Sequence, residues 1–459
     1  MSAAAARPLT AETPLPPLMP GAAYLGHLRR MRDNPLRLFR DAVHAYGDIV
    51  RFQLGPETAI LLGHPDAIKY VLQDRHRAFG KGTPGFIKMK RVLGEGLVTS
   101  EGDFWLRQRR IAQPAFHRQR IASFAQVMVR DTLDLSHRWE ALAARGQTVD
   151  VHQEMMSLTL RIVGEALLSR DLSDSAGAVS KALAVVLHHI IDRTTSPWDP
   201  PERIPVPSNR RFVKARAALD EVVWSVINER RRSGEDAGDL LSMLMKARDE
   251  ETGESMTDRQ LRDEVMTMFL AGHETTANAL TWTFMLLSDH PEIAERLTRE
   301  VRSVLKGRAP VLEDLAKLDY VRMVLDESMR LYPPAWVIAR RALEDGETCG
   351  YRIPKGALLF PSPWAVHRNP RVWPQPDRFD PERFSKDRVA QHPRYAYFPF
   401  GGGPRQCIGQ GFALMEAQLI LATLAQNFRA RTTPDYRLAM EPQVTLRAKY
   451  GLPMTITRA

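Results

Sequence analysis

One of the two cysteines in this chain lies in a glycine-rich loop, where a thiol could carry out chemistry. The segment FPFGGGPRQCIGQGFALMEAQ, residues 398–418, has glycines on both sides of Cys407 and continues into an apolar run of helical periodicity. The N-terminus of a helix offers unpaired N–H groups and the positive end of the helix dipole, and both favour a thiolate over a thiol. Glycine has no Cβ, so the backbone here can approach a flat group closely.

Three interpretations of Cys407 follow from these residues. A lone cysteine is most often a small buried apolar residue. A phosphate-binding loop would close a strand and be followed by Gly-Lys-Ser or Gly-Lys-Thr, and this segment has neither feature. A thiolate that ligates the metal of a large planar cofactor accounts for both the glycines and the helix. The other cysteine, Cys349 in EDGETCGYRIPKG, is interpreted as an inert strand or turn residue.

Other residues have spacings that allow chemistry but are also common in structural roles. Glu327 and Arg330 are i,i+3 neighbours, a spacing that usually gives a surface ion pair. Trp105 and Arg109 are neighbours on one helical face and could be a core tryptophan and a surface arginine. The sequence HETTA at His273 begins like the zinc motif H-E-x-x-H, but alanine replaces the second histidine, so His273 is not expected to bind a metal.

Helical patterns dominate the elements that must position these residues. Residues 104–305 are almost wholly helical in periodicity, with a break at 194–211 where several prolines forbid a continuing helix. The longest apolar helix is predicted over 256–291, with Thr257 or Asp258 as its cap and a proline at its end.

Strand patterns are short and lie at the two ends of the chain. Residues 50–72 alternate as strands and become helical after a His-Pro pair, and residues 340–363 and 428–458 show strand-like alternation with turns. No β-α-β repetition indicates a nucleotide-binding sheet. The sequence therefore predicts a fold that is mainly α with small β-sheets.

Length and composition limit the class of protein. A chain of 459 residues is long enough for about three domains, but no linker, low-complexity tract or repeat marks a boundary. Residues 1–20 are rich in alanine and proline and predict a flexible arm rather than a signal peptide. No window approaches the roughly 18 apolar residues of a membrane span. Two cysteines give no disulfide framework, which favours a cytoplasmic location.

The net charge of +10 raises the question of a charged partner. Arginines and lysines are dispersed among acidic residues instead of forming a stripe with aromatics, which argues against nucleic-acid binding. Two interpretations stay open: a solvated surface with an arginine-rich bias, or a local basic face that receives an acidic protein.

The loop around Cys407 contains a longer motif that resembles a known family. Phe400, Gly403, Arg405, Cys407 and Gly409 form F-x-x-G-x-R-x-C-x-G, which is similar to the haem-binding loop of the cytochrome P-450 haem-thiolate monooxygenases. The sequences WLRQR, AGHETT, ESMR and PERF, in the chain order of that family, extend the resemblance from about residue 20 to the C-terminus. The loop and the long helix are most similar to the subgroup of bacterial fatty-acid hydroxylases, although no fused reductase follows in this sequence.

The resemblance implies a fold and a cofactor. It implies the P-450 fold, a single prism-shaped haem domain over residues 21–459, in place of the three domains suggested by length. It implies haem b with Cys407 as the thiolate ligand of the iron. Guanidinium groups form bidentate hydrogen bonds with carboxylates, which suits the propionates of haem. The cofactor-binding residues implied in this way are Trp105, Arg109, Ala271, Arg340, Phe400, Arg405, Cys407 and Gly409.

The resemblance also implies a reaction. One atom of O₂ is inserted into a C–H or C=C bond of an apolar substrate, and the other leaves as water. Two electrons are expected from a separate ferredoxin or flavodoxin type of donor with its reductase. Glu274 and Thr275 are the implied catalytic residues: Thr275 bonds to dioxygen and Glu274 relays protons. Thr275 could instead only bond back to the carbonyl of Ala271. A peroxide-driven enzyme of the same family and a non-catalytic haem sensor or carrier are the alternative functions.

Two further groups of residues take their roles from the resemblance. Glu327, Arg330 and Arg383 would form a buried cluster behind the haem, in which each charge has a partner. Small or apolar residues would line the substrate pocket, with segment 182–215 as a lid, which suits a lipid, terpenoid or steroid. The stretch LGPETAILL offers no basic or phenolic group for a fatty-acid carboxylate. The implied pocket residues are Val98, Ala271, Ala335, Val337 and Val444.

Overall fold

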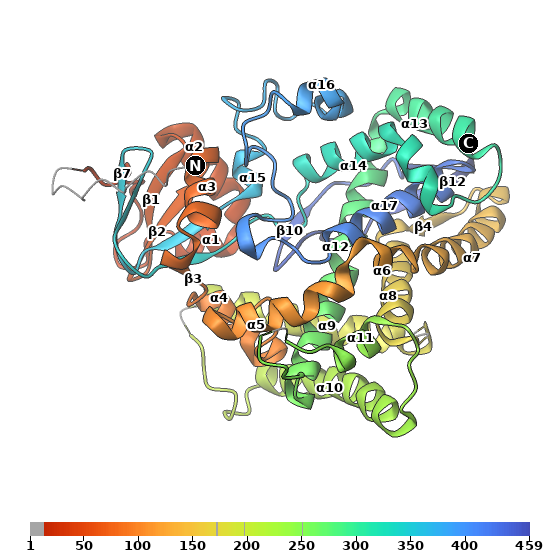
Figure 1. Cartoon of the computed structure of the whole chain (residues 1–459). Coiled ribbons are helices and arrows are strands. Elements are labelled where there is room, and N and C mark those ends of the chain that lie inside the picture. Colours follow the sequence, from red (N-terminus) through yellow and green to blue (C-terminus); the bar gives the residue numbers. More distant parts are fainter. Residues whose placement is uncertain (1–12, 171–172, 197, 250) are drawn as a thin grey trace. The chain divides into compact units, whose positions relative to one another are not determined.

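The computed structural model describes residues 13–459 except 171–172, 197 and 250 (Figure 1). Contacts between Cα atoms divide the chain into two compact units. The first unit comprises Met1–Phe86, Trp336–Asp377 and His392–Gln406, and the second comprises Ile87–Ala335, Arg378–Gln391 and Cys407–Ala459. Within the described part of the chain, none of the helices combines the length and apolarity needed to cross a membrane.

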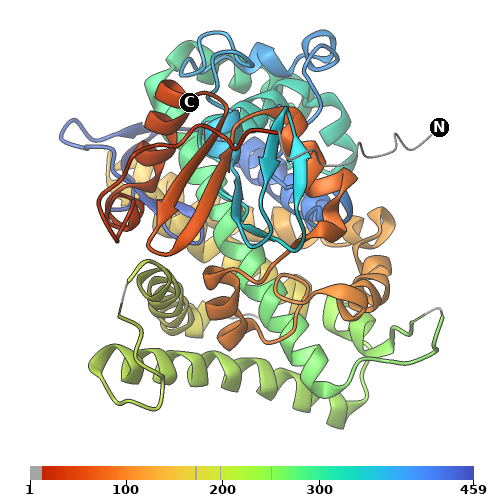
Figure 2. The same ribbon diagram turned by 90° about the vertical axis from the view of Figure 1, so that its left-hand side faces the viewer.

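The first unit is built on a five-stranded sheet of order β1-β2-β8-β5-β3. β1 and β2 are antiparallel, with Ile49 opposite Leu62, and β8 runs parallel to β2. Figure 2 shows the red-orange N-terminal strands beside the cyan strands from later in the chain. The strands predicted within 50–72 and 340–363 are thereby confirmed. The sheet strands are β1 (Ile49–Leu54), β2 (Glu57–Leu62), β3 (Phe79–Gly80), β5 (Arg340–Ala342) and β8 (Leu358–Pro361).

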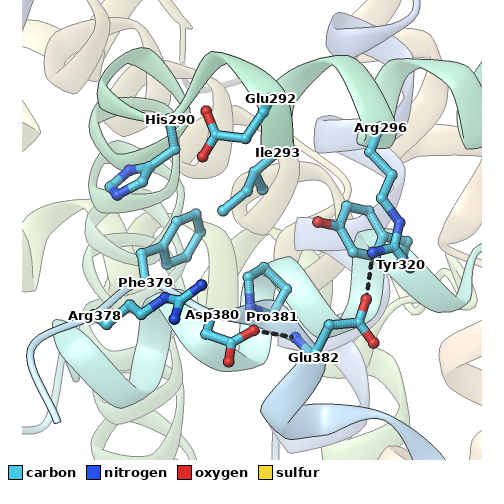
Figure 3. Close-up of a pocket in the computed structure, with 10 residues that line it drawn as sticks. All are labelled: His290, Glu292, Ile293, Arg296, Tyr320, Arg378, Phe379, Asp380, Pro381 and Glu382. Carbon is cyan, nitrogen blue, oxygen red and sulfur yellow. Dashed lines mark hydrogen bonds and ion pairs between the residues drawn. The ribbon is translucent and has the colours of Figure 1, made fainter. Parts of the chain in front are cut away.

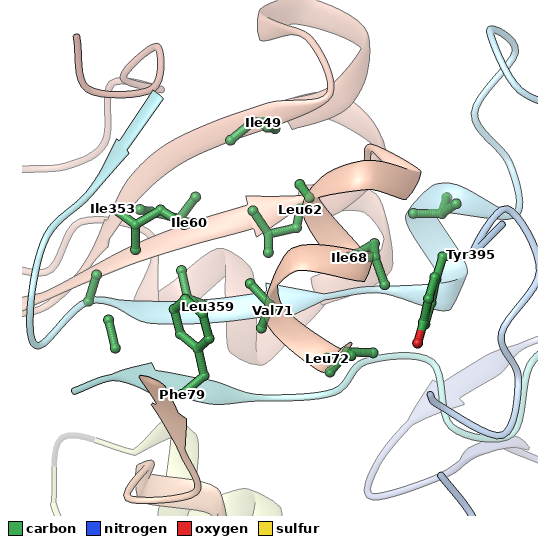
Figure 4. Packing of buried hydrophobic residues seen from close by; sticks show 14 of the residues in the cluster. Ile49, Ile60, Leu62, Ile68, Val71, Leu72, Phe79, Ile353, Leu359 and Tyr395 are labelled. Carbon is green, nitrogen blue, oxygen red and sulfur yellow. The ribbon is translucent and has the colours of Figure 1, made fainter. Parts of the chain in front are cut away.

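Short helices and a small hairpin surround this sheet in the first unit. Branched apolar residues from the strands and from α3 pack into one buried cluster (Figure 4), which includes Ile60, Leu62, Ile68 and Leu359. Burial of such side chains is the main favourable term in folding. The remaining elements are α1 (Leu28–Asp33), α2 (Pro35–Tyr46), α3 (Pro65–Lys69), η1 (Tyr70–Asp74), η2 (His76–Ala78), β6 (Gly346–Thr348), β7 (Tyr351–Ile353), α15 (Pro363–Val366) and η6 (Gly403–Arg405).

The predicted N-terminal arm is described only in its second half. The backbone of Met19 donates to the carbonyl of Arg51 at 2.8 Å, and Arg51 donates to the carbonyl of Pro17 at 2.9 Å. Met19 is buried. Residues 13–20 are therefore held along β1 by backbone hydrogen bonds, and residues 1–12 of the predicted arm lie outside the described residues.

The long helix α12 (Asp258–Asp289) is the central element of the second unit. Thr257 caps it, and Gln260 completes a capping box by bonding back to the Thr257 backbone. Pro291 begins the next helix, α13 (Pro291–Leu305). The predicted start and stop signals of this helix are confirmed. α12 packs against α8 (Val151–Leu168), α10 (Pro207–Ser233), α14 (Asp319–Leu331) and α17 (Gln410–Ala425).

The predicted break at 194–211 separates α9 (Ser173–Thr195) from α10. The break is ordered by polar side chains: Arg193 donates to Asn209 at 2.9 Å, and the Asn209 amide donates to the carbonyls of Pro201 and Ile204 at 2.9 Å. Prolines prevent a helix here, and these hydrogen bonds replace the missing helical ones.

The other elements of the second unit include two small sheets. β12 pairs with β4 and β9, and β10 pairs with β11 as a hairpin, which confirms the strands predicted in 428–458. The elements are α4 (Pro84–Leu93, which begins in the first unit), α5 (Gly102–Ala112), η3 (Gln113–Phe116), α6 (Arg118–Ala122), α7 (Ala125–Ala144), β4 (Thr148–Asp150), α11 (Leu240–Lys246), η4 (Leu312–Lys317), η5 (Pro381–Phe384), α16 (Lys386–Val389), β9 (Phe428–Thr432), β10 (Met440–Pro442), β11 (Leu446–Ala448) and β12 (Pro453–Arg458).

Candidate active site

Cys407 lies three residues before α17, whose N-cap is Gly409. Its thiol is free and retains solvent-accessible surface. Burial among the surrounding protein atoms nevertheless raises the pKa of this thiol, while a hydrogen bond from the Gly409 backbone and the charge of Arg109 lower it. The residue is thus exposed to solvent, while its thiol lies among enough protein atoms for burial to raise its pKa. This arrangement differs from the small, fully buried cysteine that was the simplest interpretation of the sequence.

Two of the loop glycines are required by packing within the first unit. A Cβ on Gly402 would overlap the ring of Tyr395. Gly403 has a φ of +64°, and a Cβ there would overlap the carbonyl of Leu72. The absence of a Cβ therefore serves contacts between segments of the protein at these two positions.

The helix α5 brings two of the predicted cofactor residues onto one face of the second unit. Trp105 is buried and Arg109 is half-buried, one helical turn apart. Arg109 donates from Nε to the Gln113 side chain at 2.9 Å, and its charge acts on Cys407. The guanidinium of Arg109 and the thiol of Cys407 therefore interact electrostatically.

The other predicted cofactor residues belong to the first unit. Arg340 lies on β5, is 7% exposed and donates to the carbonyl of Ala339 at 2.8 Å. Phe400 and Arg405 are half-buried, and Arg405 ends the short helix η6.

Midway along α12, one residue of this largely buried helix is exposed to solvent. Ala271 is exposed, although its neighbours in the stretch 261–287 are buried or half-buried. Thr275, one turn later on the same face, is half-buried and donates from Oγ1 to the carbonyl of Ala271 at 2.7 Å. The structure thus contains the backbone bond that was the simpler interpretation of Thr275. The hydroxyl proton is used in that bond, and its lone pairs can still accept a hydrogen bond.

Gly272 faces α8 rather than the open side of α12. A Cβ at this position would lie 3.1 Å from the nearer methyl group of Val163. Beside it, the Thr159 hydroxyl donates to the carbonyl of His273 at 2.9 Å. Close packing of α8 therefore explains this glycine in the middle of a helix.

Glu274 is a buried carboxyl group in the same turn of α12. It is 3% exposed, and burial raises the pKa of Glu274, while a hydrogen bond with Thr445 and the charge of Arg447 lower it. Its Oε2 atom is buried without a hydrogen-bond partner among the described residues. A carboxyl group whose pKa is raised toward neutrality is suited to accepting and donating protons.

Glu327, Arg330 and Arg383 lie together in the second unit. Glu327 and Arg330 are fully buried and form a two-pronged pair, with N–O distances of 2.6 and 2.8 Å. Arg383 approaches the same carboxylate at 3.4 Å, and the Asp380 backbone donates to it at 2.9 Å. Arg330 also donates to the carbonyl of Arg378 at 3.1 Å. This is a buried, multiply bonded cluster and not a surface ion pair.

The family profile described as Cytochrome P450 matches residues 14–451 of the chain. The chain belongs to the cytochrome P450 family.

Relatives and a solved structure agree with this membership. The cyclooctatin synthase of Streptomyces melanosporofaciens is 40% identical over 93% of this chain and 92% of its own length. The cyclooctat-9-en-7-ol 5-monooxygenase of the same organism is 40% identical over 90% of this chain and 89% of its own. The crystal structure of the haem domain of cytochrome P450DA superposes with a TM-score of 0.88 at 30% identity, over 96% of this chain and 97% of that one. The predicted P450 fold is confirmed.

Cytochromes P450 carry haem b, and the residues of this chain fit it. The free thiol of the exposed Cys407 can bind the iron, because coordination deprotonates a thiol even where burial raises its pKa. The exposed Ala271 has no side chain beyond Cβ, so a flat ring can lie against α12 there. Among the described residues no group of three or more His, Cys, Asp or Glu side chains could hold a metal by itself. His273 is buried, and burial lowers its pKa to about 4.

The residues predicted to line the substrate pocket of this cytochrome P450 are distributed over both units. Val98, Ala335 and Val444 are half-buried in the second unit, and Val337 is half-buried in the first. The loop before Val98 is fastened to the start of α12. The backbone N–H groups of Glu95 and Leu97 donate to Asp263 and Glu264, at 2.9 and 3.0 Å.

A cavity of about 340 Å³ lies elsewhere in the second unit, next to the Glu327 cluster (Figure 3). Arg296 pairs with Glu382 and lies 4.0 Å over the ring of Tyr320, so charges in its wall neutralise one another. None of the predicted substrate residues lines this cavity. Its lining residues are His290, Glu292, Ile293, Arg296, Tyr320, Arg378, Phe379, Asp380, Pro381 and Glu382.

Three buried polar residues around α12 were not predicted from the sequence. Asn278 donates to Thr445 at 3.1 Å, and the Thr445 hydroxyl lowers the pKa of Glu274. Glu416 on α17 is fully buried, which raises its pKa to about 8, and neither of its carboxyl oxygens has a hydrogen-bond partner among the described residues. The signal for Asn278 and Glu416 was present: each interrupts an apolar helical run. Thr445 carried no such signal, because threonine is ordinary in the strand-like pattern predicted over 428–458.

Proposed function

We propose that this cytochrome P450 monooxygenase hydroxylates a cyclic terpenoid. The observation that carries the proposal is the 40% identity, over 90% of the chain, to a relative whose name describes oxidation of cyclooctat-9-en-7-ol at position 5. The small or apolar side chains of Val98, Ala271, Ala335, Val337 and Val444 support it, because apolar pocket walls suit such a substrate.

Cys407 is proposed as the axial thiolate, with Trp105, Arg109, Arg340 and Arg405 on the propionates. Ala271, Phe400 and Gly409 complete the cofactor surface. Haem, when bound through a thiolate, supplies the chemistry that activates O₂ with two external electrons. The proximity of Arg109 to Cys407 and the free thiol support this assignment.

Glu274 and Thr275 are proposed to handle protons for the reaction. Glu274 has a raised pKa, so its carboxyl group can donate a proton and then be protonated again by water. The Thr275 hydroxyl donates its hydrogen bond to the carbonyl of Ala271, so its oxygen can accept a hydrogen bond from a water that carries the proton. A peroxide-driven enzyme would need neither an electron donor nor this relay, and a haem sensor or carrier would leave both residues idle.

The test of the substrate class uses binding and turnover together. Cyclooctat-9-en-7-ol, a linear fatty acid and a steroid are titrated into the haem-loaded protein, and the haem absorption is followed. We expect the unsaturated cyclic alcohol to produce a substrate-type difference spectrum and, with electrons supplied, an added hydroxyl group detected by mass spectrometry. Binding and hydroxylation of the fatty acid or the steroid alone would refute the terpenoid proposal.

The electron donor is proposed to be an acidic ferredoxin or flavodoxin with its reductase. In the second unit, Arg118 and Arg120 are exposed on α6. Ile121 of the same helix lies against Gly411 at the start of α17, close to Cys407 along the chain. A basic surface beside the thiolate helix supports an acidic partner, because complementary charge accelerates association.

Electron transfer from such a donor should depend on salt. Charges on two surfaces are screened beyond about 10 Å at roughly 0.1 M ionic strength, so the rate of reduction should fall as salt rises above this range. The salt dependence of this rate is measured by stopped-flow reduction of the haem by a ferredoxin. The measurement is repeated with the Arg118→Ala and Arg120→Ala variants. A rate that is independent of salt, or full activity on hydrogen peroxide alone, would contradict the proposal.

Residues 21–459 are proposed to be one haem domain, and the protein is proposed to be cytoplasmic. The first proposal is supported by a solved haem domain that covers 96% of this chain. The second is supported by two cysteines that are both free.

A further inference from the structure

The tip of the β10–β11 hairpin touches α12 at Glu274. The tip is residues 443–445, between β10 and β11. Thr445 accepts a hydrogen bond from Asn278 Nδ2 at 3.1 Å, one helical turn after Glu274, and its hydroxyl lowers the pKa of the Glu274 carboxyl group. All three side chains are buried: Glu274 is 3% exposed, Asn278 0% and Thr445 7%. The contact therefore forms away from water, where hydrogen bonds are directional and costly to lose.

The chemistry of the three groups fixes the direction of these hydrogen bonds. The amide nitrogen of Asn278 can only donate, so the Thr445 oxygen must accept from it. The single hydroxyl proton of Thr445 is then left for the carboxylate of Glu274. A hydroxyl that donates to an ionised carboxylate makes a strong, charge-assisted bond. Thr445 thus holds one carboxyl oxygen of Glu274 in a defined orientation.

The other carboxyl oxygen is left available. Oε2 of Glu274 is buried and has no hydrogen-bond partner among the described residues. Because Thr445 binds one oxygen, it determines which way the second oxygen points. That second oxygen has no protein partner, so it is the one left to take up or release a proton.

The hairpin tip is itself held firmly. Trp282 of α12 donates from Nε1 to the carbonyl of Leu446 at 3.0 Å, and the Leu446 backbone donates to the carbonyl of Pro334 at 2.9 Å. The Gln443 backbone donates to the carbonyl of Thr445 at 3.0 Å. A positioning group is effective only when its own support is rigid. The tip also carries Val444, so the same three residues present an apolar side chain beside the hydroxyl.

We propose that Thr445 is a positioning residue for proton delivery, which holds Glu274 by one carboxyl oxygen and leaves the other to exchange protons. This inference rests on the proposed role of Glu274. A purely structural role of Thr445 would need only its shape. The two roles can be separated, because valine keeps the shape of threonine without the hydroxyl, and serine keeps the hydroxyl without the methyl.

Several titratable groups lie on the elements packed around this part of α12. Arg447 acts on Glu274 and is itself paired with Glu441 at 2.7 Å. A test must therefore observe Glu274 itself. Other titratable side chains on these elements include His152 on α8, His188 on α9, His273 on α12 and Glu416 on α17.

The experiment follows the carboxyl group by infrared spectroscopy in the haem-loaded, reduced, carbon-monoxide-bound protein. The band of protonated Glu274 is assigned by its loss in Glu274→Gln and titrated with pH. Thr445→Val removes a bond to the charged form, so the midpoint should rise by about one pH unit. Thr445→Ser should restore the parent midpoint. Thr423→Val is the matched control, since it removes a buried hydroxyl that bonds to the carbonyl of Leu419 on α17, and its midpoint should equal the parent's.

Two results with the Thr445 variants would overturn the proposal. An unchanged midpoint in Thr445→Val, or a serine variant that behaves like the valine variant, overturns the proposal. If Thr445→Val does not retain haem, Asn278→Ala takes its place, because it frees the Thr445 hydroxyl to turn away. It should move the midpoint in the same direction by less, and an unchanged midpoint again overturns the proposal.

The fraction of electrons used to form product distinguishes a failure of this proposal from a failure of the proposed function. Each variant is supplied with electrons, O₂ and cyclooctat-9-en-7-ol, and the hydrogen peroxide released is measured. Glu274→Gln and Thr445→Val should both release several-fold more peroxide than the parent. If Glu274→Gln couples as well as the parent, the role of Glu274 in the proposed function is wrong. If only Thr445→Val couples normally while Glu274→Gln does not, the positioning role alone is wrong.

Discussion

Replacing Cys407 by histidine is expected to move the absorption of the reduced, carbon-monoxide-bound protein from the position typical of cytochromes P450 to that of histidine-ligated haem. The axial ligand sets the electronic state of the iron, so an exchange of thiolate for imidazole changes the spectrum outright. Cys407 is a free, exposed cysteine. Oxygenation should fall at least a hundredfold, because the imidazole does not supply the electron density of a thiolate. The spectrum and product formation are measured on the same preparation.

The second cysteine provides the matched control. Cys349 lies in the turn between β6 and β7 with a φ of +49°, and its sulfur lies 3.7 Å from Nδ1 of His64. Cys349→Ser should leave the carbon-monoxide spectrum as it is. An unchanged spectrum in Cys407→His, or a lost one in Cys349→Ser, would show that the ligand has been assigned to the wrong residue.

The elements around this site were largely predictable because their signals are local. The cap at Thr257 and the proline at 291 fixed the ends of α12, and alternation fixed β1 and β2. A capping box or a proline acts through neighbours within one turn, so it can be recognised without knowledge of the tertiary fold.

The reasons for individual residues were less predictable, because they depend on partners distant in sequence. The glycine at 272, in the middle of a helix, accommodates Val163, more than a hundred residues earlier. The missing Cβ of Gly403 makes room for the carbonyl of Leu72. Thr445 gave no signal at all, since its contact with Asn278 arises only where the hairpin meets α12. A pattern within a short stretch of sequence cannot indicate a contact between two segments that are distant in the chain.

Glu327→Ala is expected to prevent stable haem incorporation. Removing the carboxylate leaves the guanidinium of Arg330 fully buried without its partner, and Arg383 loses the same group. Breaking a buried ion pair typically costs about 3–5 kcal/mol, which is a large part of the total stability of a protein. We expect little haem-loaded protein, and a lower midpoint of urea unfolding in what is recovered. The haem-to-protein ratio and the urea midpoint are the measurements.

A second ion pair on α14 tests whether burial is the cause. Arg322 and Asp326 are i,i+4 neighbours on the same helix, with an N–O distance of 2.7 Å, but the Arg322 side chain is 41% exposed. Water can solvate this guanidinium when its partner is removed, so Asp326→Ala should cost only about 0–1 kcal/mol and leave haem loading normal. The two variants remove one carboxylate each from neighbouring positions of one helix, and they differ in the burial of the arginine left behind. If the two variants have the same haem loading and urea midpoint, the Glu327 cluster contributes no more to stability than a surface pair. A large difference would show that the loss of stability comes from the buried, unpaired charge.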